Sequence, residues 1–467
     1  MLLSILPYLE RICNSSHYHK IRDSIFGVIQ IYFSATALHR IFHRRIVLKH
    51  IVFKINYQLV KKKRIKTKLP VKVLFVVTDN SLWCAQSVYD SFHEDSRFDP
   101  TVVALYDFIG ANRIPDDPIG NRSDYKIKTL EKNYSFFKDR GMNVIRSYKP
   151  ETGEFYNLKS LDPDIVFYEL PYHSSVPTEY WTSHVSQFAL TCYIPYGYKI
   201  ANRYQEHFNL RSFPSFWRIF AESGMHGKLF KAYSNFKGKN VFVSGYPKLD
   251  EYISTKQPSP GKYWKIARPD IKRVIWAPHW TINDKVIAFS TFHNNYKFFL
   301  KLALKYKSIE WVFKPHQELY PFCIQEGLMT VEEADAYYNK WDSLRNTSTY
   351  LKGGYFDLFK TSDALITCCG SFLAEYLPTE KPILCLANPK SIGFNIIGQK
   401  LIESYYRAET NDEIEKFILE VILKQNDYLR EKRLANMKHV VINHWGAGKT
   451  IKNHILREFS RKVQKHA

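Results

Sequence analysis

Short apolar runs alternate with longer amphipathic stretches from residue 71 onward, and each run ends in polar or small residues. Continuous runs rich in β-branched residues are typical of buried parallel strands, whereas apolar residues spaced three and four apart are typical of helices. This first series predicts strands at residues 71–77, 101–106, 143–145, 164–168, 188–194 and 241–244, with helices at residues 81–93 and 129–140.

A second series follows residues 257–268, a stretch whose Pro and Gly residues interrupt both periods and predict a linker. It predicts strands at residues 273–276, 310–313, 364–367 and 382–385, and helices at residues 296–306, 411–423, 428–440 and 446–462. Strands that alternate with helices in two series predict an α/β protein with two Rossmann-like, doubly wound domains that face a central cleft. We expect an N-terminal tail at residues 1–69, a first domain at 70–256 and a second at 257–467.

Composition excludes a disordered protein, because 45% hydrophobic and 16% aromatic residues in a chain of 467 can bury large cores. The 67 Lys and Arg residues exceed the 45 Asp and Glu residues, giving a net charge of +22. This charge favours a polyanionic partner, such as nucleic acid, anionic lipid or a phosphate-rich polymer, over a merely basic surface. No aromatic-interleaved nucleic-acid motif is present, so we expect no nucleic acid as a partner.

The charge is concentrated at the N-terminus, where residues 1–69 contain 14 Lys and Arg but only Glu10 and Asp23. Residues 24–39 are uncharged and apolar, but this stretch is shorter than the roughly 20 residues of a spanning helix. Basic residues flank the stretch and no cleavage site follows it, which argues against a signal peptide. We therefore expect a helical tail that binds an anionic membrane surface, with a lid packed on the protein's own body as the alternative.

The seven cysteines show no metal-ligand spacing, and no Walker or GxGxxG motif occurs. An odd number of cysteines in mostly apolar runs is typical of reduced thiols packed as small hydrophobes. We expect no metal and no cofactor.

Candidate chemistry lies directly after the predicted strands, where open parallel sheets bind their ligands. His, Lys, small residues with free backbone N–H groups, and carboxylates recur there. This set suits the transfer of a diphosphate-linked group, which needs cations and donors for the phosphate oxygens and a base for the attacking hydroxyl. The residues are Glu169, His173, Tyr196 and Gly197 in the first half, and His279, Lys314, His316, Gly370, Ser371 and Glu375 in the second.

Several of these residues have alternative roles. Gly370 and Ser371 precede an apolar helical stretch and predict a phosphate cradle, although Ser371 could simply cap the helix. Lys314 and His316 follow a strand, with Pro315 fixing the direction of the imidazole. Glu375 could meet a ribose or sugar hydroxyl, or act as a capping carboxylate. His316 could instead be a satisfied surface histidine, and the aromatic neighbours of His173 could simply bury it. His279 could equally be functional or not.

The order of these motifs resembles the CDP-glycerol glycerophosphotransferase family, which includes teichoic-acid and capsule polymerases. The matching stretches are Ser244–Asp250, Ile275–Trp280, Phe313–His316, Ser362–Phe372, Pro382–Leu384 and Gly448–Lys449. The resemblance implies a glycosyltransferase-B fold whose second half holds a CDP-linked donor. It also implies a lipid-linked or polymeric anionic acceptor, no tightly bound metal, and peripheral attachment to the cytoplasmic face of the cell membrane.

The same resemblance assigns roles to individual residues. His316 matches the histidine of the family's Arg-Pro-His motif, with Lys314 in place of the arginine, and Gly370 and Ser371 match a serine pair at the donor phosphate. Gly245, in the first matching stretch, is assigned to the donor side.

Two departures leave the donor and the acceptor base open. Tyr196 and Gly197 stand where the family has a Trp-His-Gly loop whose histidine is the acceptor base, so His173 or another group would take that role. Cys368 and Cys369 replace an Asp-Tyr pair in the donor loop.

Three hypotheses follow. The first is a transferase of glycerol phosphate or a related alditol phosphate onto a capsular or teichoic-type polymer, with His316, His173 and His279 as catalytic candidates. The second is a glycosyltransferase that uses a nucleotide sugar for capsule or lipopolysaccharide synthesis. The third is a basic binding protein without activity. Phosphodiester linkages in the product would separate the first from the second.

Overall fold

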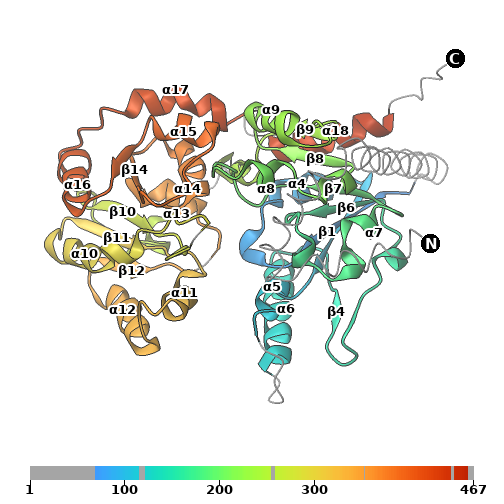
Figure 1. Cartoon of the computed structure of the whole chain (residues 1–467), viewed down its shortest axis with the longest axis horizontal. Helices are drawn as coiled ribbons and strands as arrows, with labels where there is room; N and C mark the ends of the chain where they lie inside the picture. The colour runs from blue at the N-terminus through green and yellow to red at the C-terminus, as the bar shows by residue number, and fades with distance from the viewer. Residues whose placement is uncertain are drawn as a thin grey trace, which may run out of the picture. The chain divides into compact units, whose positions relative to one another are not determined.

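A computed structural model describes residues 69–114, 121–253, 258–284, 286–351, 353–442 and 446–460. Two parallel β-sheets organise these residues (Figure 1). The first sheet has seven strands in the order β3-β2-β1-β6-β7-β8-β9. Its strands are β1 (Val71–Val77), β2 (Phe98–Ala104), β3 (Val144–Arg146), β6 (Ile165–Tyr168), β7 (Leu190–Tyr193), β8 (Arg218–Ala221) and β9 (Val241–Val243).

The second sheet has six strands in the order β12-β11-β10-β13-β14-β15, and all its neighbouring pairs are parallel. Its strands are β10 (Lys272–Ala277), β11 (Ile309–Phe313), β12 (Thr347–Thr349), β13 (Ala364–Thr367), β14 (Ile383–Leu386) and β15 (Tyr406–Ala408). The strand order reverses beside the first strand of each sheet, which is the pattern of a doubly wound domain. The prediction of two doubly wound α/β halves is confirmed.

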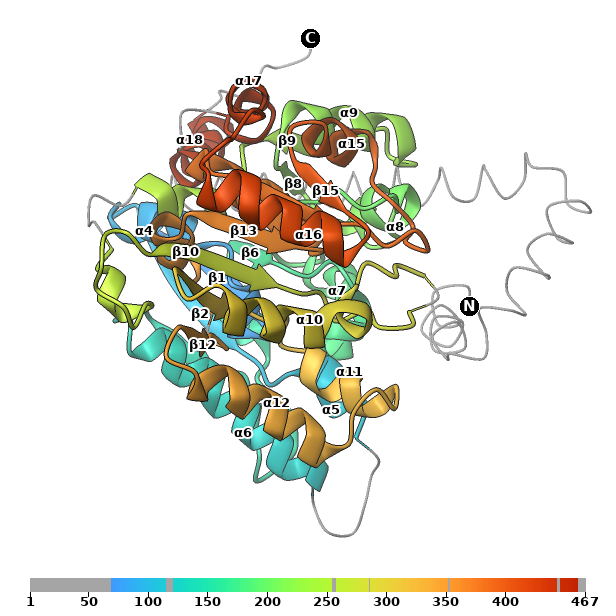
Figure 2. The same cartoon turned by 90° about the vertical axis from the view of Figure 1, so that its left-hand side faces the viewer.

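Helices cover both faces of the second sheet, and this explains why its strands β11, β13 and β14 are buried throughout. Alternate residues of β10 point to opposite faces: Val274 and Trp276 pack in one apolar cluster with Phe292 of α10, whereas Ile275 packs in the other. In Figure 2, α10, α12 and α16 lie on the near side of this sheet. The helices of this half are α10 (Phe292–Lys305), α11 (Leu319–Gln325), α12 (Val331–Ser343), α13 (Phe356–Thr361), α14 (Gly370–Glu375), α15 (Ile396–Ile402), α16 (Asn411–Phe417) and α17 (Arg430–Val440), with a π-helical turn, η9 (Ile418–Leu423), after α16.

Aromatic side chains fill one side of the first sheet. Phe75 of β1 stacks on Phe167 of β6 with ring centroids 5.0 Å apart, and Phe92 of α4 packs beside both rings. The helices of this half are α4 (Gln86–His93), α5 (Phe108–Ala111), α6 (Asn121–Lys138), α7 (Thr182–Val185), α8 (Tyr204–Phe208) and α9 (Gly224–Tyr233). The 3-10 turns are η1 (Asn80–Leu82), η2 (Leu158–Leu161), η3 (His173–Ser175), η4 (Thr178–Tyr180), η5 (Phe213–Ser215), η6 (Pro247–Ile253), η7 (Pro260–Lys262) and η8 (Leu377–Thr379).

The last helix, α18 (Ala447–Ser460), packs on the first half rather than on the second. Its Glu458 carboxylate lies 3.0 Å from Arg218 of β8, and its Lys452 ammonium lies 3.3 Å from Asp95 after α4. A Cβ on Gly448 would lie 2.4 Å from the Ser87 backbone, so glycine is required for this close approach to α4. The predicted second domain, residues 257–467, includes this helix. The domain boundaries themselves stay a prediction.

Some elements were not foreseen. Strands β8, β12 and β15 and the hairpin of β4 (Tyr148–Lys149) and β5 (Glu154–Phe155) are short and lack a clear period. In the predicted linker, Tyr263 and Trp264 are buried, and the Trp264 indole donates to Thr361 at 2.9 Å. This part of the linker is therefore packed.

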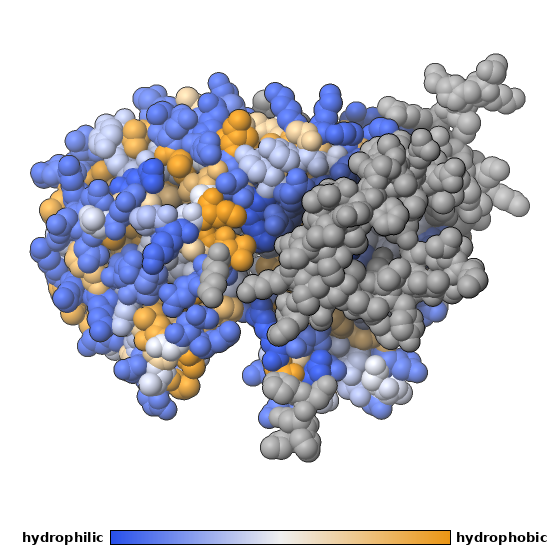
Figure 3. Space-filling model, in the orientation of Figure 1, coloured by the Kyte–Doolittle hydropathy of each residue, from blue (hydrophilic) through white to orange (hydrophobic). Residues whose placement is uncertain are grey.

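The described surface in the view of Figure 3 is mostly hydrophilic, with apolar residues in small groups. No helix among the described residues is long and apolar enough to cross a bilayer. Residues 1–68 lie outside the described part of the chain, so the predicted membrane-binding tail stays a prediction.

Candidate active site

The predicted site residues lie at the carboxyl ends of the two sheets, next to the positions where the strand order reverses. In the first half, Glu169 directly follows β6 and Tyr196 lies three residues after β7. In the second half, His279 follows β10, Lys314 follows β11 and Gly370 follows β13.

Contacts join these two sets of residues. A Cβ on Gly197 would lie 3.8 Å from the Ser371 Cβ, in ordinary van der Waals contact. The Tyr246 hydroxyl, after β9, lies 3.0 Å from Glu375 Oε1. The Gln317 amide donates to Asp79 Oδ2 at 3.0 Å. The predicted donor side and the predicted acceptor side therefore meet in the structure.

His279 and His316 form a pair with ring centroids 5.3 Å apart. The Nδ1 atom of His316 accepts from the backbone N–H of Glu318 at 3.2 Å. The Nδ1 atom of His279 lies 2.9 Å from the Thr281 hydroxyl, whose oxygen already accepts two backbone N–H groups. Both Nδ1 atoms are therefore acceptors, so each neutral ring carries its proton on Nε2.

Burial keeps both rings neutral. It lowers the pKa of His279 to about 4. It also lowers the pKa of His316 well below the ordinary value, with further lowering from His279 and from Lys314. At neutral pH the pair offers two Nε2–H donors and no cation. This suits hydrogen bonding to phosphate oxygens better than proton abstraction.

Lys314 lies in a cage of aromatic rings. Its ammonium group lies 5.0 Å from the ring centre of Tyr355 and 5.6 Å from those of Tyr350 and Phe372. Burial lowers the pKa of Lys314 to about 8. Lys248, from η6 of the first half, places its ammonium 5.1 Å from the same Tyr355 ring. Within the described part of the chain, neither lysine forms an ion pair, although each is less than a tenth exposed.

Glu375 is fully buried and binds tyrosines from both halves. Its carboxylate accepts from Tyr355 of the second half, and Tyr246 of the first half reaches its other oxygen. The Tyr252 hydroxyl donates to the Glu375 carbonyl at 2.7 Å. The carboxylate is thus held near Lys314 and Lys248 by hydrogen bonds, and it does not cap its own short helix.

Glu169 is a buried carboxyl group on the first-half side. Its Oε1 accepts from the backbone N–H of Cys84 at 2.7 Å. Burial raises its pKa to about 8, while hydrogen bonding from Cys84 and the charge of Lys248 oppose that rise. A carboxyl group that titrates near neutral pH is suited to take a proton from a hydroxyl group.

Gly370 begins α14, whose N-cap residue is Cys369. Cys369 makes no side-chain capping bond, and Ser371 lies inside the first turn, so Ser371 is not the cap. Its hydroxyl lies 3.8 Å from Cys369 Sγ. Tyr196 offers its backbone carbonyl to Tyr246 at 2.8 Å, and burial raises the pKa of its phenol, which makes that phenol a poor base.

Two predicted residues are not gathered with the others. His173 stacks on Trp181 of the first half with ring centroids 4.8 Å apart, and its Nε2 lies 3.3 Å from the Thr182 hydroxyl. Gly245 has φ +90, and a Cβ there would lie 3.2 Å from Ala447 Cβ. Glycine at this position lets the segment around Ala447 pack closely against it.

Lys248, Tyr246 and Tyr355 were missed as site residues by the sequence analysis. Both Tyr246 and Lys248 lie in the Ser244–Asp250 stretch that carries the resemblance. Tyr246 lies three residues after β9, so the strand-end rule could have found it, whereas Lys248 belongs to η6, which that rule does not select. Tyr355 lies in a loop, where periodicity gives no signal. The described cysteines are all unpaired and buried. In the described ranges, no three His, Cys, Asp or Glu side chains cluster as metal ligands would.

No protein-family model matches this chain, and no curated protein sequence is significantly similar to it. Solved structures are similar in fold. A variant of the wall teichoic acid polymerase TagF superposes with a TM-score of 0.53 at 11% identity, covering 90% of this chain and 97% of the other. A second TagF structure, soaked with CDPG, gives a TM-score of 0.51 at 12% identity, covering 90% of this chain and 98% of the other.

A protein of Listeria monocytogenes that is described as a putative UDP-N-acetylglucosamine 2-epimerase gives a TM-score of 0.50 at 12% identity. It covers 83% of this chain and 97% of the other. At such identities the similarity concerns the fold alone. The chain has the two-domain, glycosyltransferase-B-like α/β fold that teichoic acid polymerase and these epimerases share.

Proposed function

We propose that this protein transfers glycerol phosphate, or a related alditol phosphate, from a CDP-activated donor onto a capsular or teichoic-type cell-envelope polymer. The observation that carries the proposal is the pair of buried lysines, Lys248 and Lys314, which approach the Tyr355 ring from the two halves and form no ion pair with any residue that the structure describes. Two buried ammonium groups beside two neutral imidazole donors suit a ligand with several negative charges, as a diphosphate has.

The residues divide into roles along the reaction. Lys314, His316 and His279 bind the donor phosphates, with the N–H groups of Gly370 and Ser371 beside them. The acceptor hydroxyl loses its proton to ionised Glu169 and attacks the phosphorus that bears the alditol. The bond from that phosphorus to the bridging oxygen breaks, and its electron pair leaves with CMP. Lys314 and Lys248 neutralise the charge on the phosphate oxygens.

In this proposal Glu169 is the acceptor base. The resembled family gives that role to a histidine at the position where this chain has Tyr196. The Glu169 carboxyl is buried near Lys248 and has a pKa near the working pH, whereas the Tyr196 phenol has a raised pKa. The His173 ring is engaged elsewhere, by a stack on Trp181 and by the Thr182 hydroxyl, which lies 3.3 Å from its Nε2.

Supporting evidence also comes from the comparisons, since a fold-related TagF polymerase was soaked with CDPG. The alternative is a glycosyltransferase that uses a nucleotide sugar for capsule or lipopolysaccharide synthesis. It is favoured by Cys368 and Cys369, two buried thiols where the resembled family has an Asp-Tyr pair.

The acceptor in this proposal is lipid-linked or polymeric and anionic. The protein would act at the cytoplasmic face of the cell membrane, held there by the +12 charge of residues 1–69. It would need no cofactor and bind no nucleic acid.

The test is product chemistry. The purified protein would be incubated with CDP-glycerol and a glycerol-phosphate-primed acceptor, and phosphorus NMR would follow new phosphodiesters and free CMP. Protection against heat by CMP but not UMP would support a cytidine donor. Protection by UMP alone, with no phosphodiester formed, would overturn the proposal in favour of the nucleotide-sugar alternative.

A further inference from the structure

The residues that follow Gly197 bind the second half through their backbone. The Ile200 carbonyl accepts from the backbone N–H of Asn395 at 2.8 Å, and the Asn202 N–H donates to the Gly393 carbonyl at 3.0 Å. The Tyr198 hydroxyl also donates to the carbonyl of His439, at 2.9 Å. The loop at residues 196–202, which leaves β7 of the first half, is thus fastened to the second half.

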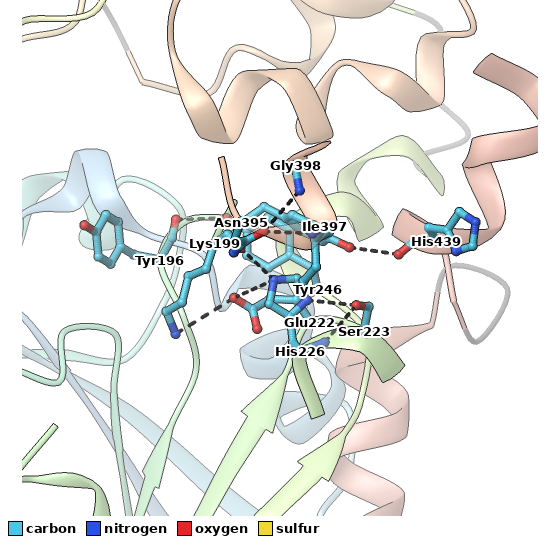
Figure 4. A network of polar contacts seen from close by, with 12 residues as sticks. Tyr196, Lys199, Glu222, Ser223, His226, Tyr246, Asn395, Ile397, Gly398 and His439 are labelled. Carbon is cyan, nitrogen blue, oxygen red and sulfur yellow. Dashed lines mark hydrogen bonds and ion pairs between the residues drawn. The ribbon is translucent and has the colours of Figure 1, made fainter. Parts of the chain in front are cut away.

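The backbone carbonyl of Lys199 lies at the centre of these contacts (Figure 4). It accepts from His226 Nε2 of the first half at 3.1 Å and from Asn395 Nδ2 of the second half at 3.0 Å. Both lone pairs of the carbonyl oxygen are therefore used, one by each half. His226 can donate because its Nδ1 accepts from the Ser223 hydroxyl at 2.8 Å and burial lowers its pKa, which keeps the ring neutral.

Asn395 has a second role that fixes its orientation. It is fully buried, and its Oδ1 accepts from the backbone N–H groups of Ile397 and Gly398 at 2.9 and 3.1 Å. This is an N-cap of α15. Because the oxygen is held by the helix, the amide nitrogen must point to Lys199. One side chain thus caps a helix of the second half and holds a loop of the first.

Two further features keep the loop in place. A Cβ on Gly398 would lie 2.8 Å from the Ile200 carbonyl oxygen, closer than real contacts allow, so only glycine permits this approach. The Lys199 side chain is buried on the first-half side, with its ammonium 3.9 Å from Glu222 Oε1 and 4.7 Å from the Tyr193 ring centre. Lys199 is therefore anchored to the first half by its side chain and to both halves by its carbonyl.

We propose that Asn395 is a positioning residue, which holds the 196–202 loop so that Gly197 stays against Ser371. The acceptor side of the site is then kept at contact distance from the donor side by a residue that touches neither ligand. The part of this inference that concerns substrates rests on the proposed function. The part that concerns the loop does not.

The loop can be tested by hydrogen exchange of the full chain, without any substrate. Asn395→Asp keeps the oxygen that caps α15 but replaces the donor to Lys199 by a carboxylate oxygen, which repels that carbonyl. We expect the Asn202 amide to exchange about tenfold faster or more, while the Ile397 and Gly398 amides stay protected. Unchanged exchange at Asn202 would overturn the proposal.

Two other variants control the result. Asn240→Asp removes the amide donor to the Phe213 and Phe216 carbonyls, which lie within the first half. It should leave the exchange of Asn202 unchanged, and equal acceleration in both variants would mean general loosening and would overturn the proposal. Asn395→Ser keeps a side-chain oxygen that can cap α15 but loses the amide donor to Lys199, so it should also release the loop, and an Asn202 amide that stays protected in it would overturn the proposal. This variant covers the case in which Asn395→Asp fails to fold.

Kinetics separate the two parts of the inference. With Asn395→Asp we expect the KM for the acceptor to rise about tenfold while heat protection by the donor nucleotide stays unchanged. A merely structural role would raise the acceptor KM and also weaken the heat protection by the donor nucleotide. If the wild-type protein showed no transfer, the proposed function would fail, yet the exchange experiment would still decide whether Asn395 holds the loop.

Discussion

The phenol of Tyr246 lies 3.0 Å from Glu375 Oε1, and this contact joins a loop of the first half to a helix of the second. The same phenol lies 2.8 Å from the Tyr196 carbonyl, so its single proton serves two acceptors. Tyr355 donates to the other carboxylate oxygen. A fully buried carboxylate needs such donors, because leaving it without hydrogen-bond partners costs about 3 kcal/mol of folding free energy.

The first prediction concerns the coupling of these two tyrosines. Tyr246→Phe and Tyr355→Phe should each lower the free energy of unfolding by about 1–3 kcal/mol, since each leaves an oxygen of Glu375 without its donor. The double variant should lose an amount that differs from the sum by at least about 0.5 kcal/mol, because the two hydroxyls share one carboxylate. Urea unfolding measures all three values.

Tyr337→Phe is the matched control. Its hydroxyl donates to the Tyr296 carbonyl at 2.9 Å, within the second half and away from Glu375. Combined with Tyr246→Phe it should give additive losses. Additive losses in the Tyr246 and Tyr355 pair as well would mean that the carboxylate does not couple them.

The central strands were predictable because nearly all of their residues are buried. Strand β1 was predicted at its observed bounds, Val71–Val77, since a continuous apolar run in a parallel sheet needs no periodicity to be seen. Strand β15 was not, because Arg407, exposed between two buried residues, breaks a run of only three.

The site was predictable only where strand ends provide it. His279, Lys314 and Gly370 follow strands and were found by that rule. Lys248 belongs to a 3-10 turn, and Tyr355 and Asn395 act through contacts between the halves. Such contacts join residues that are more than 100 positions apart in the sequence. The local pattern of apolar and polar residues does not predict them.

The second prediction tests the neutral imidazole of His316. His316→Ala should lower kcat about 10²–10³-fold, the usual loss when one hydrogen-bond donor to a developing charge is removed. His316→Gln, which keeps an N–H donor, should recover part of that loss. His184→Ala is the control, since its described contacts, to the Thr178 carbonyl and Trp181, lie outside the site. Equal turnover in His316→Ala and the wild type would remove His316 from the reaction.

The third prediction distinguishes Lys248 from an ordinary surface lysine. Lys248→Ala should weaken binding of the donor nucleotide about tenfold or more, because a buried cation facing the phosphates is lost. Lys239→Ala, an exposed lysine after α9, should leave the affinity unchanged. Isothermal titration with CDP measures both. Equal affinities for the two variants would contradict the role given to Lys248.

The fourth prediction concerns the N-terminal segment. Deletion of residues 1–69 should release the protein from anionic vesicles while leaving turnover on a water-soluble acceptor intact, because +12 of the net charge lies there. Binding of the full chain should fall as salt rises, since the Debye length shrinks from about 10 Å at 0.1 M to about 3 Å at 1 M. A truncated protein that still pellets with vesicles would place the membrane contact elsewhere.

The last prediction is the pH dependence of transfer. The active form has Glu169 ionised and Lys314 protonated, and both groups have a pKa of about 8. Below that pH most Glu169 is protonated and cannot take the acceptor proton, whereas above it Lys314 loses the charge that binds the donor. The profile of kcat/KM, which reports the free enzyme, should therefore be a narrow bell centred near pH 8.

Lys314→Arg separates the two limbs of this bell. Arginine keeps its charge at all these pH values, so the falling limb should disappear while the rising limb of Glu169 stays. Stability gives an independent check on the rising limb. Because burial raises the pKa of Glu169 from 4.5 to about 8, its contribution to stability is full below pH 4.5 and is lost as pH rises toward 8. Glu169→Gln should flatten that decline and abolish the turnover. A falling limb that persists in Lys314→Arg would assign it to another group.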